Sequence, residues 1–189
     1  MKTNVIAQRI REHKQTGRGG VTSVCSAHPD VIVAAAKLAQ AFDDILLIES
    51  TSNQVDQFGG YTGMTPKEFI AYVSKLLHDY GLSAERLVLG GDHLGPNAWQ
   101  HLPAEEAMNH ADELIRHYVA AGYQKIHLDC SMSCADDPKV LSDQVVAERA
   151  ARLCAIAEQT AQECGLPHEI VYVIGTEVPV PGGAREDLD

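Results

Sequence analysis

Five short apolar runs recur along this chain, and each is followed by a polar stretch that is rich in glycine or proline in several cases. Segments with helical periodicity separate the runs. The runs are VTSVCS at 21–26, ILLIES at 45–50, LVL at 87–89, KIHLD at 125–129 and IVYVI at 170–174. Strict alternation of strand and helix predicts a parallel sheet, because parallel strands need crossover connections that are usually helices. The pattern therefore predicts an α/β fold.

Polar residues follow every predicted strand. In an open sheet they would be expected mainly at the switch point, where the strand order reverses. An open doubly wound sheet gathers its ligand groups at that point, and the first strand here lacks the Gly-rich dinucleotide fingerprint. A β/α barrel instead builds its site from the ends of many strands, at the mouth, which is the end of the barrel where the strands have their carboxyl ends. A complete barrel needs about 250 residues. The 189 residues therefore predict one partial TIM-barrel domain, 1–189, of about five β/α units.

Several predicted helices have clear start and stop signals. Thr65, Pro66 and Glu68 predict a capping box at the start of a helix that ends near Gly81. His28 directly precedes Pro29 and is expected to cap the helix that follows. The other helices are predicted at 4–14, 31–42, 103–121 and 142–163.

Charge and apolar content narrow the function classes. The chain has 26 acidic and 15 basic residues, a net charge of −11, which disfavours nucleic acid or an anionic membrane as partner. No apolar run approaches the about 20 residues of a membrane span, and the first residues lack a signal-peptide core. The five cysteines, an odd number, favour reduced thiols over a disulfide framework. We expect a cytoplasmic protein.

The stretch LVLGGDHLGP at 87–96 is the leading candidate for chemistry. Its strand is expected to break at Gly90-Gly91 and to place Asp92 and His93 at the mouth. Imidazole and carboxylate suit a transition metal, zinc above all, which can stabilise the enolate of an aldol cleavage. We predict His93 as a metal ligand and Asp92 as the acid or base beside it. The alternative is an Asp-His pair that only fixes the turn.

Other strand ends supply candidates for substrate binding, namely Glu49, Ser52, Asn53, Asp129 and Ser131. Glu49 follows an apolar run and needs a partner once buried, which the hydroxyls and amides of 50–54 could supply. His127 and Asp129 share one face, so they either face the ligand or form a hydrogen-bonded pair inside the barrel.

Two further features remain open in the sequence. Glu177 is a tentative metal ligand, and its alternative role is to anchor a loop. The loop 59–63 could act as a lid, or it could be a turn cluster with Tyr61 packed down. The histidines expected at the surface are His101, His110, His117 and His168.

Five longer motifs resemble one known family. They are SVCSAHP at 23–29, IESTSNQVDQFGGYTGMTP at 48–66, LGGDHLGPNAWQ at 89–100, KIHLDCSMSCADDP at 125–138 and VIGTEVPVPGG at 173–183. Together they are similar to the Z-type subunit (GatZ/KbaZ) of bacterial D-tagatose-1,6-bisphosphate aldolase, a group also labelled as tagatose-6-phosphate kinases. The resemblance covers essentially the whole chain and implies a TIM barrel related to class II aldolases.

The resemblance also implies a function and a partner. The Z subunit of that family supports the activity and stability of a catalytic Y subunit in the catabolism of galactitol or N-acetylgalactosamine. Asp92-His93 is similar to the Asp-His pair of class II aldolases, in which the histidine binds zinc and the aspartate donates a proton. Those enzymes take further zinc ligands from later strands, which a chain ending at Asp189 does not reach. We therefore expect an incomplete zinc site, no certain cofactor, and an auxiliary subunit whose mouth is vestigial or binds a phosphosugar.

Three alternatives stay open beside the auxiliary subunit. The chain could be a zinc-dependent class II aldolase in its own right. It could be a kinase, although the sequence has no G-x-x-x-x-G-K-[ST] loop and no Gly-rich loop paired with a strand lysine. It could also be a scaffold whose mouth binds nothing. The open sheet edges of a partial barrel favour association, with the Y subunit or with a second copy.

Overall fold

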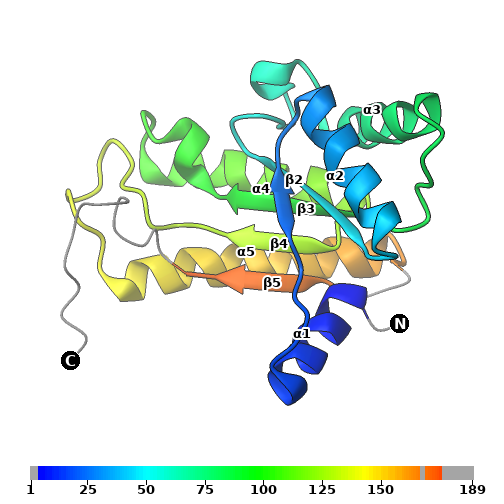
Figure 1. Ribbon diagram of the computed structural model, residues 1–189. Coiled ribbons are helices and arrows are strands. Elements are labelled where there is room, and N and C mark those ends of the chain that lie inside the picture. The colour runs from blue at the N-terminus through cyan, green and yellow to red at the C-terminus, as the bar shows by residue number, and fades with distance from the viewer. Residues whose placement is uncertain (1–3, 167–168, 176–189) are drawn as a thin grey trace.

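The computed structural model describes residues 4–166 and 169–175. These residues form one five-stranded sheet in the order β1-β2-β3-β4-β5, with every neighbouring pair parallel (Figure 1). The strands are β1 (Ser23–Cys25), β2 (Leu46–Thr51), β3 (Leu87–Leu94), β4 (Lys125–Leu128) and β5 (Val171–Ile174). The predicted α/β fold with a parallel sheet is confirmed, and the sequential strand order is that of consecutive β/α-barrel units.

The helices separate into a main layer and one outlier. Figure 1 shows α2 to α5 along one side of the sheet, whereas α1 lies apart from them. The bounds are α1 (Val5–Thr16), α2 (Pro29–Ala41), α3 (Pro66–Asp79), α4 (Ala104–Ala120) and α5 (Asp143–Glu163), with short 3₁₀ helices η1 (Gly60–Thr62) and η2 (Pro96–Trp99). Among the described residues, no helix combines the length and hydropathy that a bilayer crossing requires.

The helix starts follow the predicted capping chemistry. His28 accepts a hydrogen bond at Nδ1 from the backbone N–H of Asp30, at 3.2 Å. The Glu68 carboxylate accepts from the backbone N–H of Thr65 at 2.8 Å, which confirms the capping box. Both helices therefore begin within two residues of their expected positions.

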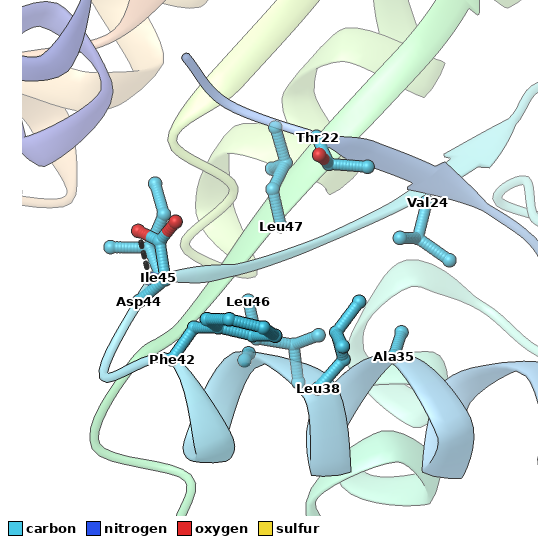
Figure 2. Close-up of a pocket in the computed structure, with 10 residues that line it drawn as sticks. Thr22, Val24, Ala35, Leu38, Phe42, Asp44, Ile45, Leu46 and Leu47 are labelled. Atoms are coloured by element: carbon cyan, nitrogen blue, oxygen red, sulfur yellow. Dashed lines mark hydrogen bonds between the residues drawn. The ribbon is translucent and has the colours of Figure 1, made fainter. Parts of the chain in front are cut away.

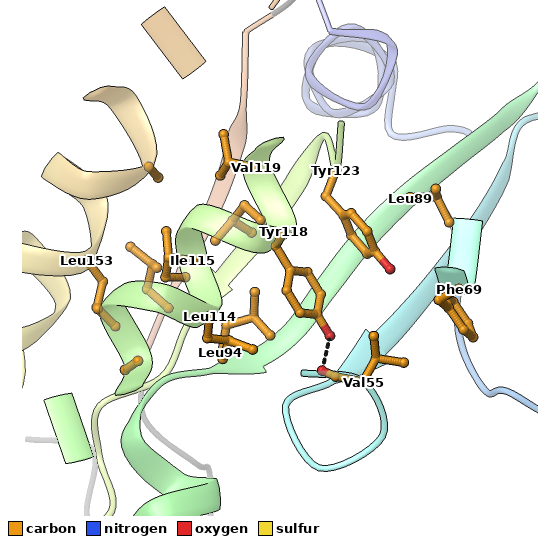
Figure 3. Packing of buried hydrophobic residues seen from close by; sticks show 14 of the residues in the cluster. Val55, Phe69, Leu89, Leu94, Leu114, Ile115, Tyr118, Val119, Tyr123 and Leu153 are labelled. Carbon is orange, nitrogen blue, oxygen red and sulfur yellow. Dashed lines mark hydrogen bonds between the residues drawn. The ribbon is translucent and has the colours of Figure 1, made fainter. Parts of the chain in front are cut away.

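Alternation along the strands divides the apolar residues between the two faces of the sheet. The outer face packs on α2 to α5 in the main core (Figure 3), which includes Ile48, Leu89, Phe69, Leu114, Ile115, Tyr118 and Tyr123. The opposite face of the sheet, away from α2 to α5, is referred to as the concave face. On it, Leu47 and Val88 pack with Ile6 of α1 in a smaller cluster. The concave face above this small cluster is polar, and it carries the candidate site.

Strand β3 is longer than the sequence predicted. It continues through Gly90 and Gly91 to Leu94, so the expected break at the glycines is wrong. A Cβ at Gly90 would lie 3.0 Å from Oε1 of Glu49, and a Cβ at Gly91 would lie 2.3 Å from Cδ1 of Leu94. The two glycines therefore make room for neighbouring side chains, and the strand continues to Leu94 with a shift of its register against β4 between Gly91 and Leu94.

An apolar groove lies beside the edge strand β1, between that strand and α2 (Figure 2). Val24 and Ala35 lie along it, together with Leu38 and Phe42, which are exposed large apolar side chains. The groove therefore presents apolar surface to the solvent.

Candidate functional site

A charged network occupies the concave face of β2, β3 and β4. The strand register pairs Glu49 with Gly90 and Gly90 with Lys125. Because Gly90 has no side chain, Glu49 and Lys125 meet across it. Farther along the same face, Asp92 of β3 and His127 of β4 approach each other. The site therefore depends on three strands that are far apart in the sequence.

Glu49 and Lys125 form an ion pair at the floor of the site. Their side chains are 2% and 10% exposed, and Nζ of Lys125 lies 2.9 Å from Oε1 and 3.0 Å from Oε2 of Glu49. Ser23 Oγ donates to Oε1 at 3.0 Å. The expectation that residues 50–54 would satisfy Glu49 is therefore wrong. Sequence reasoning missed Lys125, although the period of two in KIHLD places it on the same face as His127.

Asp92 is held by groups from two strands. Its Oδ1 lies 3.0 Å from Nδ1 of His127, and its Oδ2 lies 3.1 Å from Nδ1 of His93. Nζ of Lys125 is 3.8 Å from Oδ1. The hydrogen bond from His127 lowers the pKa of Asp92 far below its ordinary value, and His93 and Lys125 lower it further against the opposing effect of burial. Asp92 is therefore an ionised hydrogen-bond acceptor.

Asp92, His93 and His127 could together hold a metal ion. One ligand atom from each lies within 4.8 Å of the others, and the two imidazole centroids are 4.6 Å apart. Two imidazoles and a carboxylate are donor types that zinc prefers, so the set fits a transition metal in chemistry and spacing. The sequence left His127 open between a ligand role and a bond to Asp129, and the structure places it against Asp92. His93 has φ of 50°, an uncommon left-handed conformation for a non-glycine residue.

The candidates for substrate binding lie at different depths. Ser52 is buried and donates from Oγ to the backbone oxygen of His93 at 3.3 Å. Asp129 is buried, and its Oδ1 accepts from the backbone N–H and Oγ of Ser131 at 3.0 and 2.6 Å. Asn53 is exposed. Glu177 lies outside the described residues.

Cys25 ends β1 on the same concave face, in register with Glu49. Although Cys25 is exposed, partial desolvation by its neighbours raises the pKa of its thiol, and the carboxylate of Asp92 contributes to this rise. The Sγ atom lies 3.8 Å from Oε1 of Gln54. The thiol is therefore protonated at neutral pH and adds a weak donor to the rim of the site.

The comparisons with known proteins agree with this architecture. Residues 6–189 match the family model described as D-tagatose-1,6-bisphosphate aldolase subunit GatZ/KbaZ-like. The chain is also similar to the crystal structure of a probable tagatose 6 phosphate kinase from Sinorhizobium meliloti 1021, with 49% identity and a TM-score of 0.78. That match covers 87% of this chain but only 41% of the Sinorhizobium chain. Because the family model extends over nearly all of the sequence, the chain belongs to the GatZ/KbaZ-like family of D-tagatose-1,6-bisphosphate aldolase subunits.

Proposed function

We propose that this chain is an auxiliary subunit of tagatose-1,6-bisphosphate aldolase. It supports the activity and stability of a catalytic Y subunit, which forms glycerone phosphate and glyceraldehyde 3-phosphate during galactitol or N-acetylgalactosamine catabolism. Family membership supports the aldolase complex as the setting. The observation that carries the auxiliary role is the environment of Asp92, whose two carboxylate oxygens already contact His127 and His93. A carboxylate held in this way orients imidazoles and is poorly placed to donate a proton.

The surface of the chain supports association with a partner. The groove between β1 and α2 exposes the apolar side chains of Leu38 and Phe42. Exposed apolar patches commonly serve as contact surfaces between polypeptides. Within the proposal, the mouth keeps a phosphosugar-binding surface at Asn53 and Ser131, and Glu49, Ser52 and Asp129 support it from below.

The auxiliary role can be tested by reconstitution. Purified chain is added to a catalytic Y subunit, and tagatose-1,6-bisphosphate cleavage and the thermal half-life of the activity are measured. We expect both to exceed the values for the Y subunit alone or with heat-denatured chain. If the native chain changes neither quantity, the auxiliary function is wrong.

A second candidate is a zinc-dependent class II aldolase, which the position of His127 favours. Asp92, His93 and His127 would together hold the ion. Bound zinc would supply a Lewis acid that polarises the substrate carbonyl. Stoichiometric zinc that is lost in His93→Ala and His127→Ala, but retained in the exposed control His117→Ala, would establish the metal site. Cleavage by the zinc-loaded chain without a Y subunit would then favour this candidate over the auxiliary role.

The name of the Sinorhizobium protein makes the kinase a third activity to assay. The proposal expects no ATP-dependent phosphorylation of tagatose 6-phosphate by this chain. A phosphorylated product whose formation requires the chain and ATP would contradict that expectation and replace the auxiliary function.

A further inference from the structure

Two exposed aromatic side chains stand on the loop that joins β2 to α3. Phe58 is 71% exposed and Tyr61 is 72% exposed. The loop follows the carboxyl end of β2, so it borders the same mouth as Asp92. A single exposed aromatic residue is common in soluble proteins, but two of them three positions apart on one loop call for a physical explanation.

The backbone of this loop is tightly bonded. Oδ1 of the buried Asp56 accepts from the N–H groups of Phe58 and Gly60, at 2.7 and 2.9 Å. The N–H of Tyr61 donates to the backbone oxygen of Asn53 at 2.9 Å. A Cβ at Gly60 would lie 2.5 Å from the backbone oxygen of Gln54, so the backbones at these two positions are in close contact. The loop is a hydrogen-bonded turn cluster, but the expectation that Tyr61 packs down in it is wrong, because Tyr61 is exposed.

The core holds the same loop from below. The hydroxyl of Tyr118 donates to the backbone oxygen of the fully buried Val55 at 2.8 Å (Figure 3). The ring of Phe58 contacts His110 edge-on at 5.7 Å between centroids, and His110 stacks on Trp99 at 5.2 Å. His110 was expected at the surface, but it is half-buried in this aromatic stack. Phe58 is thus supported on one side and open on the other.

Exposed aromatic rings on a fixed backbone have the properties of a binding hot spot. Aromatic side chains bury a large area when bound, and a preorganised loop loses little conformational entropy on association. The loop needs no such exposure for its own stability, because its hydrogen bonds involve backbone groups and the side chains of other residues.

We propose that Phe58 and Tyr61 form the docking contact for the catalytic subunit of the aldolase, which would bind over the mouth. This inference rests on the proposed function, and it commits to the catalytic subunit because the family is described as an aldolase subunit. The contact is apolar, so the partner is expected to offer an apolar pocket. Docking at this loop would place the partner on the face that carries Asp92 and His93.

The test measures affinity and does not depend on activity. The full chain and its Phe58→Ala, Tyr61→Ala and double variants are titrated with a Y subunit by calorimetry. We expect the double variant to bind at least about tenfold more weakly. Tyr80→Ala is the matched control, because Tyr80 is also exposed but lies at the far end of α3, and it should bind like the native chain. Thermal melts confirm that each variant is folded.

Each outcome has a defined meaning. If the native chain binds and the double variant binds equally well, the docking inference is overturned while the auxiliary function stands. Absence of binding by the native chain overturns both. Sedimentation tests a second copy of this chain as occupant: self-association lost in the double variant, with unchanged binding to the Y subunit, also overturns the inference.

Discussion

The buried ion pair between Glu49 and Lys125 sets the electrostatics of the mouth at the scale of single residues. Each carboxylate oxygen of Glu49 lies within 3.0 Å of Nζ of Lys125, and that ammonium group also lies 3.8 Å from Asp92. Two acids therefore share one buried cation. Removal of the cation leaves the carboxylate of Glu49 desolvated and opposed only by the hydroxyl of Ser23.

Lys125→Met is expected to lower the free energy of unfolding by about 3–5 kcal/mol, the usual cost of stranding one member of a buried pair. Urea denaturation measures the change. Lys75→Met is the control, since Lys75 is exposed and pairs with Asp79 on the surface of α3, and it should change stability little. The double variant Glu49→Leu/Lys125→Met should recover much of the loss. A Lys125→Met protein as stable as the native chain would contradict this assignment.

The lowered pKa of Asp92 predicts a specific acid sensitivity. Because the folded pKa lies below the unfolded value of about 3.9, Asp92 stabilises the fold above that pH. The contribution is lost as the pH falls through the acid range toward the folded pKa. Asp92→Asn should therefore show a shallower loss of stability than the native chain when urea midpoints are compared from neutral pH downward through this range. Parallel pH profiles for the two proteins would show that Asp92 is not the titrating group.

At the scale of elements, the turn after β3 is packed against the end of β4. The backbone N–H of Asp129 donates to the backbone oxygen of Leu94 at 3.0 Å. Gly95 follows in an extended conformation, and a Cβ there would lie 1.8 Å from the backbone oxygen of Asp129. The glycine is required by the close approach of two backbones, and this approach positions the loops that leave both strands.

Gly95→Ala is expected to destabilise the protein by about 3 kcal/mol or to prevent folding, because neither backbone can move without losing the strand pairing. Thermal melts and soluble yield report the effect. Gly20→Ala serves as the matched control, since no atom lies within 4 Å of the added Cβ, and its melting temperature should equal that of the native chain. Equal melting temperatures for both variants would disprove the close contact.

At the scale of the whole molecule, the start of α1 contacts two segments that are far from it in the sequence, the one before β4 and the one before β5. Asn4 is 1% exposed, and its Nδ2 donates to the backbone oxygens of Gln124 at 2.9 Å and Glu169 at 2.8 Å. The neighbouring Ile6 packs on Leu47 and Val88 of the concave face. The N-terminal residues thus tie together the segments that lead into β4 and β5.

Asn4→Ala is expected to destabilise the chain by about 1–3 kcal/mol and to increase hydrogen exchange in β5, because the carbonyl groups of Gln124 and Glu169 lose the hydrogen bonds from the Asn4 amide. Asn4→Ser separates the two roles of this residue, since serine can still cap α1 but cannot reach both carbonyl groups. Gln8→Ala, on an exposed position of the same helix, is the control. If Asn4→Ser exchanges as slowly as the native chain, capping alone explains the effect.

The sequence by itself determined the alternation of strands and helices, the parallel sheet, several caps and the family, because these depend on local periodicity and on motifs within single segments. It also located Asp92 and His93. The tertiary structure decided which side chains meet. Glu49 and Lys125 are separated by 76 positions, and Asp92 and His127 by 35, so their pairing depends on strand register and not on any local pattern. The same holds for β3, where glycines that resemble a strand break instead make room for Glu49 and Leu94.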